Sequence, residues 1–372
     1  MGSEHSEQTD LKDFPLWGKL GAKRVLTSFD LEITARCSNN CTHCYINLPP
    51  GDKNAKANEL SLEELESIAD QAVELGALWC LVSGGEPLLR EDFSEIYLML
   101  KKKGLLVSVF TSATLITPDH IELFKKYPPR EIEVTVYGIT EETYEKISRV
   151  KGSYKKFLKG LDLLLDSGLK VRLKTMALRS NLNEFEKIAD FCREKTDDYY
   201  KFDPLLHLRY DLDPVRNEEI KSERLTPDEI VKLEQNDPER SANIDDHCDH
   251  FIFESGEHRN CNHLFHCGAG QNSFTVSPEG IFRLCSSLWF PAMIYDLRKG
   301  SLRDAWENFV PKVLDTRSDN PEFHSKCHSC NIINLCLWCP AHAYLESGSI
   351  DKWVDSFCEI AHAREVGINK NK

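Results

Sequence analysis

Between residues 24 and 210, short apolar runs rich in β-branched residues alternate with segments of helical periodicity, and this alternation constrains the fold more than any other feature. The expected strands are residues 24–35, 78–82, 105–111, 131–137, 169–177 and 205–210. A capping box at Ser61 and Glu64 opens the first helical segment. Strands that alternate with helices predict a parallel α/β sheet with right-handed crossovers, which curls into a barrel or part of one. Ligands of such folds bind at the carboxyl ends of the strands.

Three cysteines follow the first predicted strand, at Cys37, Cys41 and Cys44, with the spacing C-x3-C-x2-C. A structural zinc site uses four ligands in closed tetrahedral geometry, usually as two C-x2-C pairs. Three close thiols without a local fourth suit an iron–sulfur cluster with one open iron, and a loop of metal-free thiols is the alternative. A second motif, SGGEP at residues 83–87, follows the second predicted strand. Its two glycines let the backbone approach a ligand closely, and Glu86 offers a carboxylate.

These two motifs resemble the cluster loop and the GGEP loop of radical S-adenosylmethionine (SAM) enzymes. The resemblance covers about residues 25–210 and implies a partial (β/α)6 barrel of the TIM type. It also implies that Cys37, Cys41 and Cys44 hold a 4Fe-4S cluster, whose open iron binds the amino and carboxylate groups of SAM. The further SAM contacts that it implies are His43, Gly84, Gly85, Glu86 and Pro87, with Ser112 and Thr135 at later strand ends. For Ser112 and Thr135, ordinary capping of strand ends is the alternative.

Beyond residue 259 the alternation ends and cysteines become frequent. Their spacing resembles the SPASM extension of radical SAM enzymes, a small cysteine-rich domain with two auxiliary 4Fe-4S clusters. The resemblance assigns Cys261, Cys267, Cys285 and Cys339 to the first auxiliary cluster, and Cys327, Cys330, Cys336 and Cys358 to the second. A pair of zinc sites is the alternative for these eight thiols. Of the other cysteines, Cys80 and Cys192 fall in apolar patterns typical of core residues. Cys248 is expected in a polar approach to the array, with a metal site or a hydrogen-atom donor as the alternative.

Five segments are expected along the chain: a lead segment (1–24), the barrel (25–210), an acidic linking segment (211–259), the SPASM domain (260–362) and a C-terminal tail (363–372). The net charge of the 372 residues is −14, and this acidic balance argues against a nucleic-acid partner. No apolar run approaches the roughly 20 residues of a membrane helix, and the polar start lacks a secretory signal. We therefore expect a cytoplasmic protein without a membrane partner.

The resemblance implies an enzyme with three 4Fe-4S clusters. In such enzymes SAM is cleaved reductively to methionine and a 5′-deoxyadenosyl radical, which takes a hydrogen atom from a substrate C–H bond. Most SPASM members act on peptides or proteins, so the expected reaction is an oxidative modification, such as a cross-link, of a ribosomally made peptide. A small molecule, for example a sugar, a cofactor or a tetrapyrrole precursor, is the alternative substrate. A non-enzymatic iron–sulfur or zinc protein is the third interpretation.

Two kinds of partner are expected besides the substrate. The resemblance implies an electron donor such as a flavodoxin or a ferredoxin. The roughly 24 residues before the barrel are too few for a leader-binding domain, so a leader-guided substrate would require a separate leader-peptide recognition protein. The sequence indicates no particular catalytic acid, base or hydrogen donor.

Overall fold

The computed structural model describes residues 24–198, 200–242, 262–336 and 338–370. Its centre is a nine-stranded sheet with the order β6-β5-β4-β3-β2-β1-β7-β8-β9. The parallel strands are β1 (Ser28–Thr34), β2 (Trp79–Gly84), β3 (Leu106–Thr111), β4 (Glu131–Thr135), β5 (Val171–Met176), β6 (Lys201–Asp203) and β7 (Ser273–Val276). Strands β8 (Ile281–Arg283) and β9 (Tyr295–Asp296) add antiparallel pairs. The sheet curls without closing, so the predicted partial barrel is confirmed.

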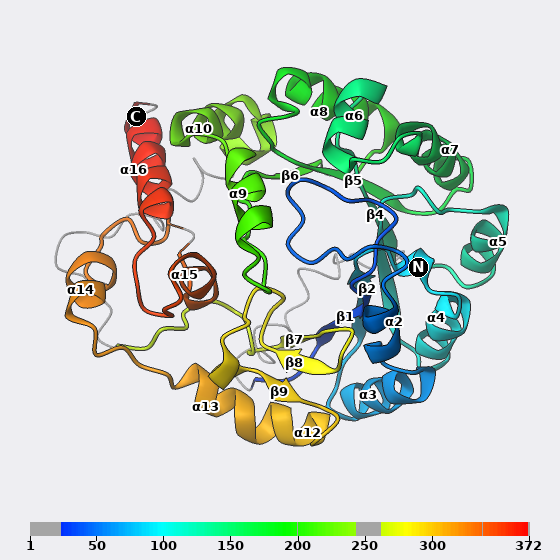
Figure 1. Cartoon of the computed structure of the whole chain (residues 1–372), viewed down its shortest axis with the longest axis horizontal. Coiled ribbons are helices and arrows are strands. Elements are labelled where there is room, and N and C mark those ends of the chain that lie inside the picture. The colour runs from blue at the N-terminus through cyan, green and yellow to red at the C-terminus, as the bar shows by residue number, and fades with distance from the viewer. Residues whose placement is uncertain (1–23, 199, 243–261, 337, 371–372) are drawn as a thin grey trace, which may run out of the picture.

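Helices cover the outer face of the sheet. Those that follow the barrel strands are α2 (Lys53–Asn58), α3 (Leu62–Glu74), α4 (Phe93–Lys102), α5 (Pro118–Lys126), α6 (Glu141–Ser148), α7 (Ser153–Leu165), α8 (Phe185–Lys195), α9 (Pro214–Ser222) and α10 (Pro227–Asn236). The cysteine-rich region adds α12 (Leu302–Asp304), α13 (Val310–Leu314), α14 (Pro321–Phe323), α15 (Pro340–Ser347) and α16 (Asp355–Lys370). Figure 1 shows α3 to α8 in an arc around the sheet, with α14 to α16 on the opposite side.

The side-chain alternation of β1 explains how the sheet separates core from cavity. Successive residues of a strand point to opposite faces. Phe29, Leu31 and Ile33 are at most 1% exposed and pack in the hydrophobic core beneath the helices. Asp30 and Glu32 point the other way and line a cavity inside the partial barrel. The polar inner face of this strand is therefore available for ligand chemistry.

Most predicted elements lie within a few residues of their expected positions, and the capping box at Ser61 and Glu64 is present. The sixth strand is an exception, because β6 ends at Asp203 rather than beginning at Leu205. Pro204 has no N–H for a sheet ladder, and the Leu205 N–H donates to the Asp203 carboxylate at 2.9 Å. The apolar run after it packs as irregular chain in a small cluster that includes Leu206 and Leu208.

The sheet is continuous across the expected boundary between the barrel and the cysteine-rich region. Strand β7 comes from that region and pairs in parallel with β1, with Ser28 opposite Ser273. Residues 211–242 of the expected linking segment hold α9 and α10, and residues 363–370 of the expected tail belong to α16. The division into segments stays a prediction, but these segments share one framework.

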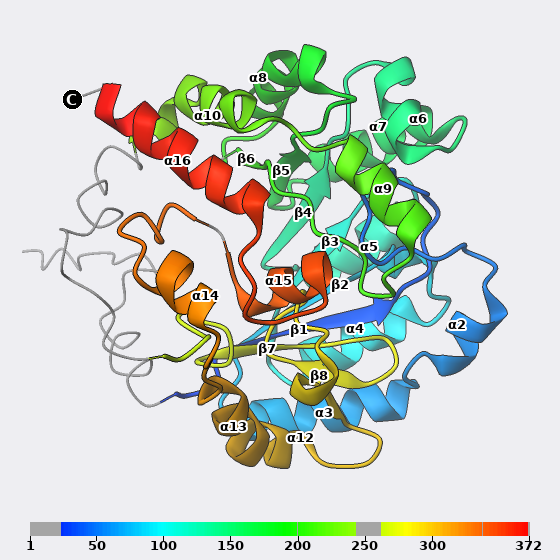
Figure 2. The same cartoon turned by 60° about the vertical axis from the view of Figure 1, so that its left-hand side comes forward.

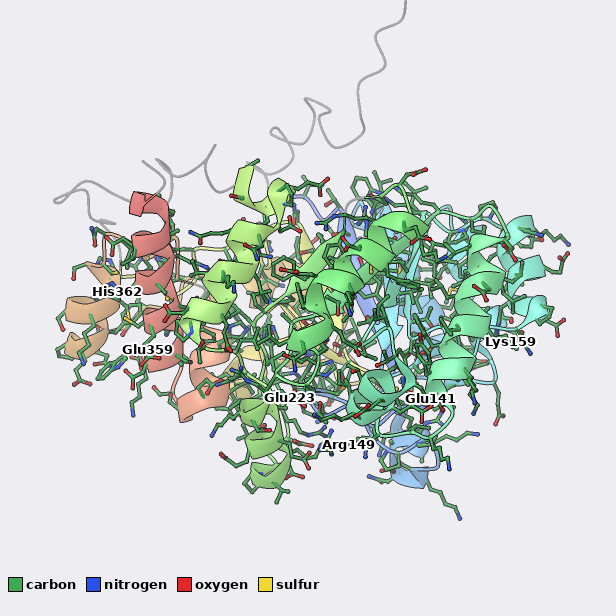
Figure 3. All side chains as sticks on the ribbon, turned by 90° about the horizontal axis from the view of Figure 1, so that it is seen from above. Glu141, Arg149, Lys159, Glu223, Glu359 and His362 are labelled. Carbon is green, nitrogen blue, oxygen red and sulfur yellow. The ribbon has the colours of Figure 1, made fainter. Side chains whose placement is uncertain are left out.

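The C-terminal helix α16 lies beside α10, as Figure 2 shows in red and green. Glu234 of α10 is 2% exposed and accepts hydrogen bonds from Arg364 and Arg240, which fixes the two helices to each other. Glu359 and His362 of α16 lie at one end of the molecule, and Glu141 and Lys159 lie toward the other (Figure 3).

Of the helices in the described part of the chain, none combines the length and apolar composition that a bilayer crossing requires.

Candidate active site

A cavity of about 360 Å³ opens inside the partial barrel at the carboxyl ends of the strands. It brings together nearly all of the SAM-site residues expected from the sequence. Its lining includes Cys37, Cys41, His43, Cys44, Gly84, Gly85, Ser112 and Thr135. Glu86 and Pro87 are buried beside the cavity and do not line it.

The three thiols come from the loop that follows β1. Burial and the neighbouring Glu86 carboxylate raise the pKa of Cys37, and burial raises the pKa of Cys41 to about 12. Metal ligands must be thiolates, and a bound cation reverses such shifts. The loop therefore suits a metal centre, because three neighbouring thiolates, of which Cys37 and Cys41 are buried and Cys44 is partly buried, need a positive charge between them.

Backbone packing determines why residues 84 and 85 are glycine. The Gly85 N–H donates to the Thr34 carbonyl at 2.6 Å, so the GGEP loop lies against the end of β1. A Cβ at Gly84 would lie 2.2 Å from the Thr34 carbonyl oxygen, and one at Gly85 would lie 2.3 Å from that of Arg36. Gly84 also has φ +129°, a conformation that L residues rarely adopt. The glycines were expected to let the backbone approach a ligand; the close approach that the structure shows is instead to the end of β1 and the start of the cluster loop.

Glu86 connects two strand ends beneath the cavity. Its carboxylate accepts hydrogen bonds from the Thr111 hydroxyl at 2.7 Å, the Ser112 hydroxyl at 2.5 Å and the Ser112 N–H at 2.8 Å. It is fully buried, and burial raises its pKa. The carboxylate therefore acts on the cavity through Ser112, which does line it.

Burial keeps His43 neutral, because it lowers the pKa of this side chain to about 4 with a further contribution from Arg216. The imidazole lies in an edge contact with the ring of Tyr137, with 5.3 Å between centroids. Both rings line the cavity. They provide an uncharged aromatic wall beside the three thiols.

Several titratable residues of the cavity were not expected from the sequence. They are Asp30 and Glu32 of β1, Lys174 of β5, Asp203 of β6 and the neutral His207. Glu32 forms a buried ion pair with Arg283, and Lys174 pairs with Glu133 and lies over the ring of Phe110. Polar residues at alternate positions in otherwise apolar strands were the available signal, because such positions share one face of the sheet.

Comparison with known proteins places this site in a family. Residues 31–192 match the family model of the Radical SAM superfamily. This part of the chain is a radical SAM domain. Members of the family hold a 4Fe-4S cluster and SAM, and the three thiols and the polar cavity beside them fit these two groups.

Two curated relatives and one solved structure extend the comparison of this radical SAM enzyme. The AdoMet-dependent heme synthase of Methanosarcina barkeri is 24% identical over 338 residues, which cover 85% of this chain and 92% of that protein. The subtilosin biosynthesis protein AlbA of Bacillus subtilis is 27% identical over 268 residues, which cover 68% of this chain but 54% of AlbA. SuiB of Streptococcus suis, bound to its precursor peptide SuiA, has the same fold, with a TM-score of 0.68 at 16% identity over 92% of this chain and 78% of SuiB.

The C-terminal thiols of the radical SAM enzyme gather in two places. Cys327, Cys330, Cys336 and Cys358 line a second cavity of about 280 Å³. No group of three or more His, Cys, Asp or Glu side chains in the described residues converges closely enough for a single metal ion.

The other thiol group consists of Cys267, Cys285 and Cys339, which lie near one another. Burial, with smaller contributions from the nearby Cys285 and Cys267, raises the pKa of Cys339 to about 12. Cys261, expected in the same group, lies outside the described residues, as does Cys248. Cys80 and Cys192 are each 1% exposed in the hydrophobic core, as predicted.

The Cys285 group is adjacent to the SAM cavity. Ser286 and Ser287, which follow Cys285 directly, line that cavity. His207 lines it as well, and its ring centroid lies 4.2 Å from that of His342. The backbone N–H of His342 in turn donates to the Cys339 sulfur at 3.4 Å. Contacts thus run without interruption from the cavity wall to these thiols.

Proposed function

We propose that this radical SAM enzyme carries out an oxidative modification of its substrate and passes an electron to an auxiliary cluster beside the cavity. The supporting observation is that Ser286 and Ser287 line the SAM cavity directly after Cys285. A cluster held by Cys37, Cys41 and Cys44, with SAM bound to it, would supply the 5′-deoxyadenosyl radical that removes one hydrogen atom from a substrate C–H bond. When the substrate then forms its new bond, one electron and one proton must also leave, and an acceptor close to the cavity suits the electron.

The proposed ligands follow the thiol groups. Cys37, Cys41 and Cys44 hold the SAM-binding cluster, and Glu86 orients Ser112 toward SAM. The first auxiliary cluster is held by Cys267, Cys285 and Cys339 with Cys261. The second is held by Cys327, Cys330, Cys336 and Cys358, whose shared cavity supports the assignment.

Asp30 is the residue that we assign to proton transfer. It lines the cavity and accepts a hydrogen bond from the Thr275 hydroxyl at 3.4 Å. Burial, with a smaller contribution from the carboxylate of Glu32, raises the pKa of Asp30 to about 6. Such a group is ionised at neutral pH and still basic enough to accept a proton. The neighbouring Glu32 is bound to Arg283 instead.

Replacing Asp30 with asparagine is expected to separate radical formation from product formation. The D30N enzyme should still form 5′-deoxyadenosine but release little product, because the proton has no acceptor. In the wild type the ratio of product to 5′-deoxyadenosine should rise with pH around 6, as Asp30 ionises, and this rise should be absent from D30N. The D203N enzyme, changed in a second carboxylate of the cavity, is the control and should keep the rise. Loss of the rise in D203N alone would move the assignment to Asp203.

A peptide is the substrate class that we favour. SuiB, whose fold this chain shares, was captured with a precursor peptide, and AlbA takes part in bacteriocin biosynthesis. The cavity volume of about 360 Å³ is near the lower end of the roughly 300–1,000 Å³ typical for one drug-sized ligand. A cavity of this size admits a single side chain of a peptide more readily than a whole rigid macrocycle. An electron donor such as a flavodoxin or ferredoxin and a separate leader-peptide recognition protein remain predictions.

A tetrapyrrole is the second candidate, and one observation favours it. The heme synthase of M. barkeri matches 85% of this chain and 92% of its own length. An iron tetrapyrrole would have to enter with only its reacting edge in the cavity. The two candidates can be separated by isotope transfer.

The deciding experiment offers the reconstituted enzyme two deuterated substrates under anaerobic conditions. One is the set of short peptides encoded beside the gene, and the other is Fe-coproporphyrin III. We expect deuterium to appear in 5′-deoxyadenosine only with a peptide, and the peptide to lose the mass of two hydrogens. Transfer from the tetrapyrrole alone would reject the peptide proposal. Transfer from a peptide without a mass loss would reject the oxidative step.

A further inference from the structure

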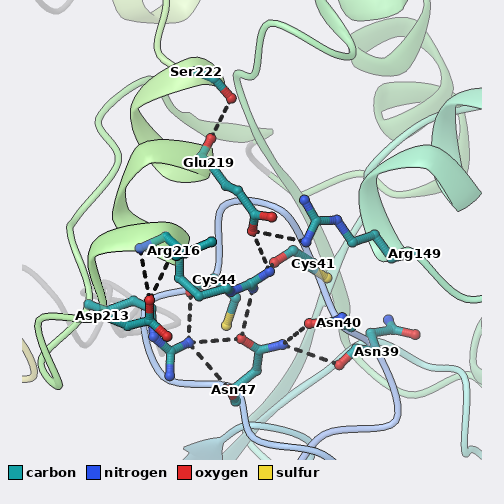
Figure 4. A network of polar contacts seen from close by, with 12 residues as sticks. Asn39, Asn40, Cys41, Cys44, Asn47, Arg149, Asp213, Arg216, Glu219 and Ser222 are labelled. Carbon is teal, nitrogen blue, oxygen red and sulfur yellow. Dashed lines mark hydrogen bonds and ion pairs between the residues drawn. The ribbon is translucent and has the colours of Figure 1, made fainter.

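The loop that carries Cys37, Cys41 and Cys44 is held from outside by two arginines that follow β6. Arg209 is 3% exposed, and its Nη1 donates to the carbonyl oxygens of Cys44 at 3.4 Å and Asn47 at 3.3 Å. Nη2 of Arg216 donates to the carbonyl oxygen of Cys41 at 2.8 Å (Figure 4). The backbone at both ends of the C-x2-C step is therefore bound by a guanidinium group.

Asn47 joins the two arginines. Its side-chain oxygen accepts from Arg209 at 3.2 Å and from Arg216 at 3.3 Å, while its side-chain nitrogen donates to Asn40 at 3.2 Å. Figure 4 shows Asn47 between Arg216 and the Asn39–Asn40 part of the loop. The side chains of Asn47 and Arg209 thus cross-link the loop to the chain after β6.

Each guanidinium group turns one edge to the loop and the other to a carboxylate. Nε and Nη2 of Arg209 are bound by Asp211, and Nη1 of Arg216 is bound by Glu219 at 2.7 Å. Glu219 also accepts from Arg149 at 2.9 Å, which ties in the end of α6. The carboxylates fix the orientation of the arginines and leave their positive edges facing the cysteine carbonyls.

We propose that Arg209 and Arg216 are positioning residues that hold the cluster loop and raise the reduction potential of the SAM-binding cluster. This inference rests on the proposed ligand set of Cys37, Cys41 and Cys44. A positive charge close to an iron–sulfur cluster stabilises its more negative, reduced form. Hydrogen bonds that orient ligand residues also tune such centres. Arg209 at the end of the expected barrel and Arg216 at the start of the expected linking segment thereby help to make the cluster reducible.

The chain contains a matched control for Arg209. Arg90 is 8% exposed and is bound in the same way by an aspartate two residues later, Asp92. Its Nη1 also donates to two carbonyl oxygens, those of Ile33 and Leu60, at 3.0 Å each. The two arginines therefore match in burial, charge and bonding, but only Arg209 is bonded to a cluster cysteine.

The experiment measures the midpoint potential of the cluster whose EPR spectrum changes when SAM is added. In the Arg209→Gln enzyme we expect the equilibrium constant for reduction to fall about tenfold, which is about 59 mV for one electron. Arg209→Lys should recover part of the lost reduction potential. Lysine restores the positive charge but lacks the planar guanidinium group that donates several hydrogen bonds at once. Arg90→Gln should lower the melting temperature of the metal-free protein as Arg209→Gln does, and leave the potential at the wild-type value.

Arg216→Gln is the second variant, since the side chain of Arg216 is 16% exposed and its loss disturbs packing less. It should also shift the potential in the negative direction. Unchanged potentials in both glutamine variants, or an equal shift in Arg90→Gln, would overturn the proposal. A wild type that forms no SAM-responsive cluster would instead contradict the proposed function and its ligand set.

Discussion

The enzyme in which Cys37, Cys41 and Cys44 are all replaced by alanine is expected to bind about four fewer irons than the wild type and to form no 5′-deoxyadenosine. The three thiols lie on one loop at the wall of the cavity. A four-iron cluster with one open iron takes three thiolates from the protein, so their removal leaves no anchor. With both auxiliary clusters in place, iron should fall from about twelve to about eight per chain.

Iron and sulfide counts, with 5′-deoxyadenosine measured after anaerobic reduction, check this expectation. Cys192→Ala is the control. Cys192 lies on α8, is 1% exposed in the hydrophobic core and belongs to neither of the proposed thiol groups nor to the cluster loop. It should keep the full iron content and SAM cleavage. A triple variant that keeps all of its iron would contradict the ligand assignment. Zinc in place of iron in the wild type would contradict the radical mechanism.

Replacing Gly84 with alanine is expected to lower the free energy of unfolding by about 3 kcal/mol. The new Cβ would lie 2.2 Å from the Thr34 carbonyl oxygen, and φ at this position is +129°. Overpacking costs about 1–3 kcal/mol, and a positive φ adds about 1–2 kcal/mol for a residue with a Cβ. The GGEP loop and the end of β1 cannot separate to relieve the contact without breaking the hydrogen bond from Gly85 to Thr34.

Gly51→Ala is the matched control for this change. No atom lies within 4 Å of a Cβ built at Gly51, and its φ is not positive. Chemical denaturation of the metal-free protein, followed by circular dichroism, should show Gly51→Ala within about 1 kcal/mol of the wild type. Equal stability of the Gly84 and Gly51 variants would show that the packing of the two loops is not needed for folding.

The sequence alone determined the local features of the fold and site. Alternating side chains, capping boxes and the spacing of Cys37, Cys41 and Cys44 act over a few residues, so they can be identified in a linear chain. They were enough to predict the parallel sheet, the cavity at its carboxyl ends and the family. The GGEP glycines could be predicted in the same way, although the sequence did not indicate that their close contact is with the end of β1 and the cluster loop after it.

Contacts between distant segments were decided only by the tertiary structure. Arg283 pairs with Glu32 across 251 positions, and Arg209 bonds to the carbonyl of Cys44 across 165. No local sequence pattern indicates either pair, because each forms only when the sheet curls and brings distant segments together. Pairing of β7 with the free edge of β1 brings Thr275 to Asp30, and it brings Ser286 and Ser287, which follow Cys285, to the cavity wall. The chemistry of single residues was therefore visible in the sequence, and their association was fixed by the burial of a shared core.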